Sequence, residues 1–189
     1  MESKDIIITE INRLCKTCGR VFVALDGRCG SGKTTLAGEI AREIPCTVLH
    51  MDDYFLRPEQ RTPKRYAAPG ENVDHERFLQ EVLQPLHIGR QYICRPFDCS
   101  TMSLQKGVPC EAENVVLAEG SYACHPALWD YYDLHIFLTV SPDVQIERIR
   151  KRCGEDAVAA FKSRWIPLEE RYFSAFSIED RCDLRLTND

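Results

Sequence analysis

Long apolar runs and an excess of positive charge are both missing from this chain of 189 residues. No run approaches the roughly 20 apolar residues that a helix needs to cross a bilayer, and the first residues lack the basic-then-apolar order of a secretion signal. The formal net charge of −5 does not favour a broad surface for nucleic acid. We therefore expect no membrane and no nucleic-acid partner, and we expect a cytoplasmic protein.

Metal-binding cysteine patterns are also missing, although the chain contains ten cysteines. Only Cys15 and Cys18 have the C-x-x-C spacing, and no second pair of cysteines or histidines completes a zinc site. A redox role for this pair stays open, but the pair precedes the first expected strand, whereas a thioredoxin-like motif lies at a strand–helix junction. Reduced thiols in a reducing compartment are the simpler interpretation.

The most informative segment is residues 21–35, where an apolar run that predicts a buried strand leads into apolar residues at helical spacing. Between the two lies the phosphate-binding pattern G-x-x-x-x-G-K-[ST], from Gly27 to Thr34. Glycines let backbone N–H groups approach a phosphate closely, and the N-terminus of the following helix adds further donors. We expect a nucleoside triphosphate here, with Lys33 on its β- and γ-phosphates and the Thr34 hydroxyl on Mg²⁺. The predicted nucleotide-binding residues of this loop are Gly27, Arg28, Cys29, Gly30, Ser31, Gly32, Lys33, Thr34 and Thr35.

Strands and helices alternate along the rest of the chain. This alternation, without a repeat or a linker, predicts a single domain over residues 1–189, an α/β fold of the P-loop type with a parallel sheet and helices on both faces. Residues 57–71 are expected to be a loop, residues 89–113 an irregular segment with short strands or a hairpin, and residues 150–165 a short lid. The expected strands are residues 21–25, 47–51, 114–118, 134–140 and 183–187, and the expected helices lie within residues 1–18, 33–44, 74–86, 141–153 and 165–176, the last interrupted by Pro167.

Carboxylates end three of these strands. They are Asp26, the pair Asp52 and Asp53, and Glu119. Ligands of open parallel sheets bind at the carboxyl ends of the strands, and phosphoryl transfer to a hydroxyl needs a proton acceptor and groups that hold Mg²⁺. We expect Asp52 to be the base and Glu119 to bind Mg²⁺ together with Thr34. The spacing leaves open whether Asp52 or Asp53 points inward.

Several segments resemble the uridine kinase and phosphoribulokinase family of P-loop kinases. Besides the phosphate-binding loop they are residues 49–55, 72–75, 95–98 and 115–120, and the resemblance extends from about residue 21 to residue 152. It implies ATP- and Mg²⁺-dependent transfer of a phosphoryl group to the 5′-hydroxyl of a nucleoside, with Asp52 as the base. It also implies that Asp74 holds the ribose hydroxyls and that Phe97 stacks on the nucleobase. The candidate acceptor-binding residues are Asp53, Tyr54, Asp74, His75 and Phe97.

Two arginines are candidates for a lid over the transferred phosphates. Arg148 and Arg152 lie four residues apart and so share one face of the helix expected after residue 141. Two guanidinium groups on one face can hold an anion, and a solvated basic face is the alternative. In the family, the segment after the aromatic–Asp pair supplies a histidine and an arginine toward the nucleobase. Residues 99–104 contain neither, which leaves the acceptor open.

Three functions are therefore compatible with the sequence. The first is a kinase of nucleosides, and the second is a kinase of another small alcohol, such as a sugar phosphate or a vitamin precursor. The third is a nucleotide-binding regulator without turnover, although the guanine-specifying Asn-Lys-x-Asp of GTPase switches is absent. The enzyme interpretations imply ATP and Mg²⁺ as cofactors and a small-molecule acceptor as partner, and a homo-oligomer is left open.

Overall fold

The computed structural model describes residues 2–189 and is built around a parallel sheet. Five strands run in the order β2-β7-β1-β8-β9, and every neighbouring pair is parallel. Strands β1 and β7 are in register from Val21 opposite Val115 to Leu25 opposite Glu119. The strands are β1 (Val21–Gly27), β2 (Thr47–His50), β7 (Val115–Glu119), β8 (Leu134–Thr139) and β9 (Leu184–Thr187). The predicted parallel sheet is confirmed.

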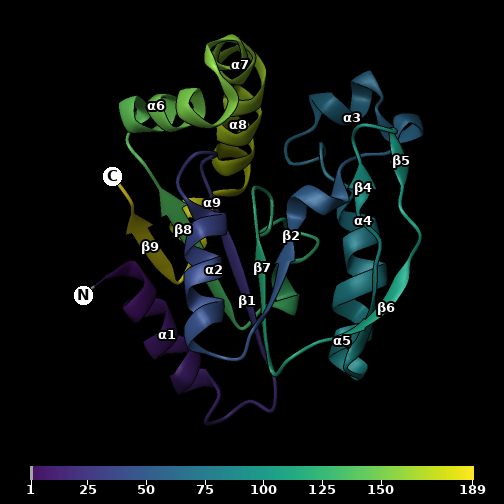
Figure 1. Ribbon diagram of the computed structural model, residues 1–189, viewed down its shortest axis with the longest axis vertical. Helices are drawn as coiled ribbons and strands as arrows, with labels where there is room; N and C mark the ends of the chain where they lie inside the picture. The colour runs from purple at the N-terminus through teal and green to yellow at the C-terminus, as the bar shows by residue number, and fades with distance from the viewer. Residues whose placement is uncertain (1) are drawn as a thin grey trace.

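Helices cover both faces of this sheet (Figure 1). On one face, Ile7 and Ile11 of α1 (Ser3–Leu14) and Ile40 of α2 (Lys33–Glu43) pack against alternate residues of β1, β7 and β8. The opposite face is covered by α4 (His75–Phe78), a π-helical turn (Leu79–Leu83), α5 (Gln84–Ile88), α8 (Ile166–Phe176) and α9 (Ile178–Arg181). Because both faces are buried, β1 and β7 are apolar almost throughout rather than alternating.

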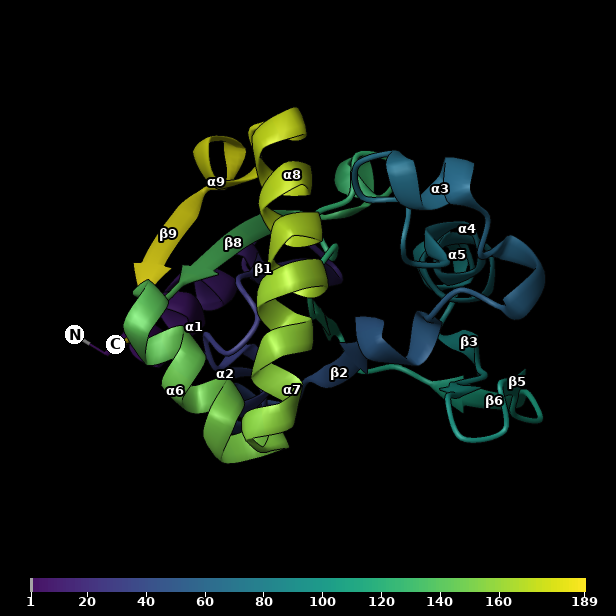
Figure 2. The same cartoon turned by 90° about the horizontal axis from the view of Figure 1, so that it is seen from above.

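Residues 56–113 form a projection beside the sheet, which we call the hairpin lobe. It contains α3 (Pro63–Ala67), α4 and α5, and two antiparallel ribbons. The ribbons pair β3 (Gln91–Cys94) with β6 (Val108–Glu111), and β4 (Phe97–Asp98) with β5 (Ser103–Leu104). Figure 2 shows this lobe to one side of β2, with α6 (Pro142–Cys153), α7 (Glu155–Ala160) and α8 on the other. The sequence predicted short strands or a hairpin within residues 89–113, and the two ribbons are present there.

Three sequence predictions need correction. The loop expected at residues 57–71 contains a 3-10 turn and α3, because Thr62 caps α3 by accepting a hydrogen bond from the Arg65 N–H and Pro63 follows at its first position. Pro167 does not interrupt its helix, since a π-helical turn (Phe161–Trp165) joins α7 to α8 and leaves the proline in the first turn of α8. The strand expected to reach residue 51 ends at His50, where a 3-10 turn begins.

The remaining helical predictions are close to the structure. Asp74 caps α4 as expected, α6 begins at Pro142, and it ends before Gly154. Residues 150–165, the segment expected to form the lid, are helical except at Gly154. No helix among residues 2–189 combines the length and the apolar character of a membrane-spanning segment.

Candidate active site

A cavity of about 650 Å³ opens at the carboxyl ends of β1, β2 and β7. The phosphate-binding loop lies at one end, and the hairpin lobe, α6 and the π-helical turn complete its walls. This is the edge of the sheet at which open parallel sheets bind ligands. The predicted residues that line the cavity are Cys29, Gly30, Gly32, Lys33, Thr34, Thr35, Asp52, Glu119, Arg148 and Arg152.

The loop after β1 has the backbone geometry of a phosphate cradle. Gly27, Gly30 and Gly32 adopt φ values of 138°, 75° and 96°, which side chains rarely allow. The Lys33 ammonium donates hydrogen bonds to the carbonyls of Gly27 (2.7 Å) and Arg28 (3.0 Å). The Ser31 hydroxyl is buried without a hydrogen-bond partner among the residues described. A phosphate supplies the acceptors that these donors need, so the loop fits a nucleotide.

The Arg28 side chain, in contrast, points away from the cradle. Its guanidinium donates to Glu170 (2.7 Å), to the Thr139 hydroxyl (2.7 Å) and to Glu179 (3.3 Å). Burial lowers the pKa of Arg28, but the bonds to the two glutamates outweigh it and raise the pKa overall. Arg28 therefore contributes its backbone to the loop, while its side chain joins β8 to α8 and α9.

Glu119, at the end of β7, contacts the other candidate metal ligand, the Thr34 hydroxyl, and also His50. Its Oε1 accepts a hydrogen bond from the Thr34 hydroxyl (3.0 Å) and lies 2.6 Å from the His50 Nδ1. This hydrogen bond raises the pKa of His50. Hydroxyl and carboxylate oxygens at the edge of a phosphate cradle are the hard ligands that Mg²⁺ prefers. Thr34 and Glu119 therefore fit a magnesium ion.

Asp52 and Asp53 point to different places. Asp52 lies in the 3-10 turn after β2, is exposed to the cavity and lines it together with Lys33. The crowded cavity wall, and then the charge of Glu119, raise the pKa of Asp52 despite the opposing charges of Lys33 and Arg152. Asp53 is absent from the cavity wall, and its carbonyl accepts a hydrogen bond from Arg77 (2.9 Å). The structure therefore brings Asp52, not Asp53, to the phosphate cradle.

The two lid candidates reach the cavity from α6. Arg148 donates to the carbonyls of Asn188 (2.6 Å) and Gly30 (3.4 Å), which places its guanidinium against the phosphate-binding loop. Arg152 is exposed, and its guanidinium lies 5.8 Å from the centre of the Phe161 ring. Both arginines line the same cavity as Lys33. They are placed to contact a phosphate bound on the loop.

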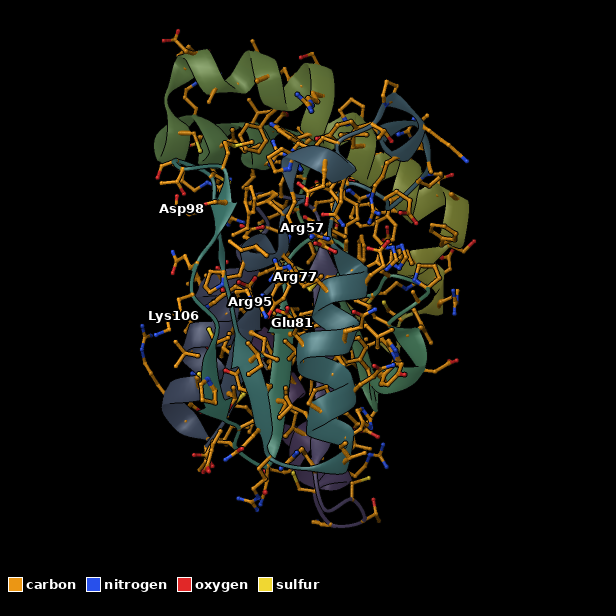
Figure 3. All side chains as sticks on the ribbon, turned by 90° about the vertical axis from the view of Figure 1, so that its right-hand side faces the viewer. Arg57, Arg77, Glu81, Arg95, Asp98 and Lys106 are labelled. Carbon is orange, nitrogen blue, oxygen red and sulfur yellow. The ribbon has the colours of Figure 1, made fainter. Side chains whose placement is uncertain are left out.

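Asp74 and Tyr54 do not reach the cavity wall. Asp74 is 1% exposed, caps α4, and lies 3.3 Å from Arg57 and 3.4 Å from Arg77 through its Oδ2. Tyr54 is buried against Phe78, with the Arg77 guanidinium 4.2 Å from its ring centre. Figure 3 shows Arg57, Arg77, Arg95 and Glu81 gathered in the hairpin lobe, with Asp98 and Lys106 farther out along its edge.

His75 and Phe97 also lie away from the cavity wall. Phe97 is buried and paired with Leu104 in the short ribbon. His75 stacks on His125 at 3.9 Å, and its Nε2 lies 3.3 Å from Glu71. Glu71, His75 and His125 are close enough to share a metal ion. However, the His125 Nδ1 accepts a hydrogen bond from the backbone N–H of residue 127 (3.1 Å), which leaves the proton on the Nε2 that a metal would need.

Sequence reasoning missed most of the cavity wall outside the phosphate-binding loop and α6. Glu169 of α8 accepts hydrogen bonds from the Cys29 backbone N–H (3.0 Å) and the Ser121 hydroxyl (2.6 Å). Asn72 lies inside a segment that carried the family resemblance, but nothing in its spacing marked it. The missed residues of this wall are Met51, Phe55, Asn72, Val73, Gly120, Ser121, Tyr122, Phe161, Trp165 and Glu169.

No protein-family model matches the chain, but several curated proteins align with most of its length. The uridine kinase of Ureaplasma parvum serovar 3 is 26% identical over 170 residues, which cover 80% of this chain and 81% of that protein. The cytidylate kinase of Pyrobaculum islandicum is 28% identical over 165 residues, which cover 84% of this chain and 77% of that protein. Both relatives are kinases by name.

Solved structures share the fold. A possible uridine kinase from Bacillus stearothermophilus has a TM-score of 0.66 at 21% identity, covering 95% of this chain and 98% of that one. A candidate fructose transport system kinase from Silicibacter sp. TM1040 has a TM-score of 0.73 at 22% identity, covering 98% of both chains. At these identities the structures establish the fold alone. Together with the aligned kinases and the phosphate-binding loop, they support the resemblance to the uridine kinase and phosphoribulokinase family of P-loop kinases.

Proposed function

We propose that the protein is an ATP- and Mg²⁺-dependent kinase that phosphorylates a hydroxyl of a small molecule, with the 5′-hydroxyl of a nucleoside as the first acceptor to test. One observation carries the proposal. Asp52 faces the same cavity as Lys33, Thr34 and Glu119. A proton acceptor and the groups that hold ATP and Mg²⁺ must share one site for phosphoryl transfer to a hydroxyl.

The proposed reaction uses each of these residues in a distinct role. Asp52 orients the acceptor hydroxyl and accepts its proton as the oxygen attacks the γ-phosphoryl group, and ADP leaves. The raised pKa of Asp52 makes it a stronger base than an ordinary aspartate. Lys33 and the two α6 arginines stabilise the negative charge on the transferred group. Thr34 and Glu119 would hold Mg²⁺, which would neutralise negative charge on the nucleotide phosphates.

A second candidate keeps this chemistry and changes the acceptor to another small alcohol. It is favoured by the positions of Asp74 and Phe97, the two residues that the resemblance assigns to ribose and nucleobase. Neither lines the cavity, and Asp74 is engaged by two arginines. The third candidate, a regulator without turnover, requires only that ATP binds.

Substitution of Asp52 separates the kinase from the regulator. We expect Asp52→Asn to lower turnover by roughly 10²–10⁴-fold, because it removes the proton acceptor, while the affinity for ATP stays within about threefold, because the phosphate-binding loop is intact. The assay measures ADP release from Mg-ATP across nucleosides and small alcohols, against a blank without acceptor. ATP affinity is measured separately by calorimetry.

Asp53→Asn is the matched control, because it removes a carboxylate that does not line the cavity. It should keep turnover near the wild-type value. Equal turnover in wild type and Asp52→Asn contradicts the assignment of Asp52 as the base. ATP binding with no acceptor-stimulated ADP release contradicts the kinase and supports the regulator.

A further inference from the structure

Two backbone N–H groups of the phosphate-binding loop, those of Gly30 and Gly32, have no acceptor among residues 2–189. The other N–H groups of the loop before α2 are already used. Those of residues 27, 28, 29 and 31 donate to the Asp26 carboxylate, the Leu138 carbonyl, the Glu169 carboxylate and the Arg28 carbonyl, respectively. Together with the first turn of α2, the Gly30 and Gly32 N–H groups are therefore the donors that the loop can offer to a phosphate.

The peptide plane that carries the Gly30 N–H is held from α6. The carbonyl of this plane belongs to Cys29 and accepts a hydrogen bond from the Gln145 Nε2 (2.9 Å). A Cβ at Gly30 would lie 3.3 Å from the Gln145 carbonyl oxygen, so α6 packs closely on this peptide. The peptide bond is trans, and its C=O and N–H therefore point in opposite directions. A donor that fixes the carbonyl also fixes the direction of the N–H.

The peptide plane that carries the Gly32 N–H is held in the same way from the segment after β9. Its carbonyl belongs to Ser31 and accepts a hydrogen bond from the Asn188 Nδ2 (2.7 Å). A Cβ at Gly32 would lie 2.7 Å from this Nδ2, so the amide group packs directly on the glycine. The two unused N–H groups of the loop thus lie on two planes that side chains outside the loop hold by the carbonyl.

Both amide side chains are fixed by the surrounding fold. Gln145 lies on α6, and it is only 5% exposed. The Asn188 N–H donates to the Thr139 carbonyl (3.0 Å), which continues the pairing of β9 with β8. Its carbonyl accepts a hydrogen bond from Arg148 of α6 (2.6 Å), and Figure 2 shows the end of β9 beside this helix. The two donors are therefore in place without a nucleotide.

We propose that Gln145 and Asn188 are positioning residues of the nucleotide site. They hold two peptide planes of the loop so that the Gly30 and Gly32 N–H groups face the phosphates. Because the planes are oriented in advance, the loop does not have to be ordered when the nucleotide binds, and affinity for the phosphate chain is gained. The inference rests on the proposed function only in that a nucleotide binds at this loop, and it does not depend on the acceptor.

Binding of tripolyphosphate tests the inference without requiring turnover, because this probe has the phosphate chain of ATP and lacks its base and sugar. Gln145→Met and Asn188→Leu keep the approximate size and the neutral charge of the side chains but remove the donors. We expect each substitution to raise the dissociation constant of tripolyphosphate about tenfold, which is the effect of losing one hydrogen bond. Calorimetry in the presence of Mg²⁺ measures it. The KM for ATP should rise by a similar factor, and the KM for the acceptor should change less than twofold.

Asn114→Leu is the matched control. Asn114 precedes β7 at the opposite end of the strands, where its Oδ1 accepts a hydrogen bond from Arg90 (2.8 Å). The substitution removes an amide group of the same kind away from the loop, and it should leave the dissociation constant of tripolyphosphate within twofold of wild type. Melting temperatures measure the stability of each variant, because a purely structural role would lower the melting temperature and leave the affinity of the folded protein unchanged.

The outcomes separate this inference from the proposed function. A wild-type affinity for tripolyphosphate in Gln145→Met or in Asn188→Leu overturns the assignment of that residue and leaves the kinase intact. An equal loss of affinity in Asn114→Leu overturns the inference, because the loss then follows from general destabilisation. If both variants bind tripolyphosphate more weakly than wild type but no acceptor stimulates ADP release, the inference is supported and the proposed function is overturned.

Discussion

The cavity has a phosphate end, formed by the loop after β1, and a second end, formed by the rest of its wall. The two ends are built from different parts of the chain. The phosphate end is a contiguous loop with three glycines at positive φ. Its backbone N–H groups are the candidate phosphate ligands, and its backbone carbonyls hold the Lys33 ammonium. The rest of the cavity wall, the second end, is assembled from side chains of separate segments, among them Phe55, Asn72 and Trp165. A backbone cradle depends on local conformation and tolerates little change. A wall of side chains can exchange members while the fold persists, so that one end can stay constant while the acceptor differs.

The interactions that hold the phosphate-binding loop and the hairpin lobe in place also differ. Asp26 fixes the phosphate end, because its carboxylate accepts hydrogen bonds from the backbone N–H groups of Gly27 (2.7 Å), Tyr122 (3.1 Å) and Cys124 (2.9 Å), and from the Tyr172 hydroxyl (2.9 Å). Burial raises the pKa of Asp26 to about 6, against the opposing effects of the hydrogen bonds from Cys124, Gly27 and Tyr172 and of the charge of Lys33. The hairpin lobe instead rests on pairs of charged side chains, several of them partly exposed.

The largest contrast should come from adding one methyl group in the phosphate-binding loop and one in the hairpin lobe. A Cβ at Gly27 would lie 2.0 Å from the Leu138 carbonyl oxygen, at a φ of 138°. A Cβ at Gly107, in the hairpin lobe, would meet the side chains of Ile93 at 2.9 Å and Arg95 at 3.1 Å, which can move. We expect Gly27→Ala to lower the free energy of unfolding by about 4 kcal/mol, from overpacking and backbone strain together. Gly107→Ala should cost about 1 kcal/mol.

Urea unfolding, followed by circular dichroism, measures both glycine variants under the same conditions. Gly107→Ala is the matched control, because it adds the same methyl group beside movable side chains. Equal destabilisation by the two substitutions would show that the phosphate end is no more rigid than the hairpin lobe, and the contrast between the ends would then be lost.

A smaller effect is expected for Asp26→Asn. The carboxylate accepts four hydrogen bonds, whereas an asparagine has one acceptor oxygen and turns an NH₂ group toward the remaining donors. We expect the variant to lose about 3 kcal/mol of stability, because buried donors are left without partners. Thermal unfolding measures the change. The control is Tyr172→Phe, which removes one of the four donors and should cost about 1 kcal/mol. A loss for Asp26→Asn no greater than this would contradict the role of Asp26 as a fourfold acceptor.

The same contrast explains which features of the fold and of the site could be predicted from the sequence. The phosphate-binding loop and the sheet were predictable, because they depend on spacing within a few residues. The position of Asp74 relative to the cavity depends on Arg57 and Arg77, which reach it through tertiary packing. Phe161 and Trp165 were missed because a π-helical turn sets which side of their helix faces the cavity. Apolar periodicity does not encode such a turn.

The smallest predicted effect concerns pH and the support of the hairpin lobe. Burial, and then the charge of His75, lower the pKa of His125 to about 3. The unfolded chain takes up a proton on this histidine near pH 6.5, and the folded chain does not. The free energy of unfolding should therefore fall as the pH drops from 6.5 to 5.5, by about 1 kcal/mol from this residue.

His125→Phe keeps an aromatic ring in the stack with His75 but cannot bind a proton. We expect it to lower stability at pH 7, because the hydrogen bond that Nδ1 accepts from the backbone N–H of residue 127 is lost. Its stability should nevertheless fall less steeply than that of wild type between pH 6.5 and 5.5. Urea unfolding at several pH values measures the two slopes. Parallel slopes would mean that His125 takes up its proton in the folded protein as readily as in the unfolded chain, and the hairpin lobe would then not depend on a neutral histidine at its junction with the loop after β7.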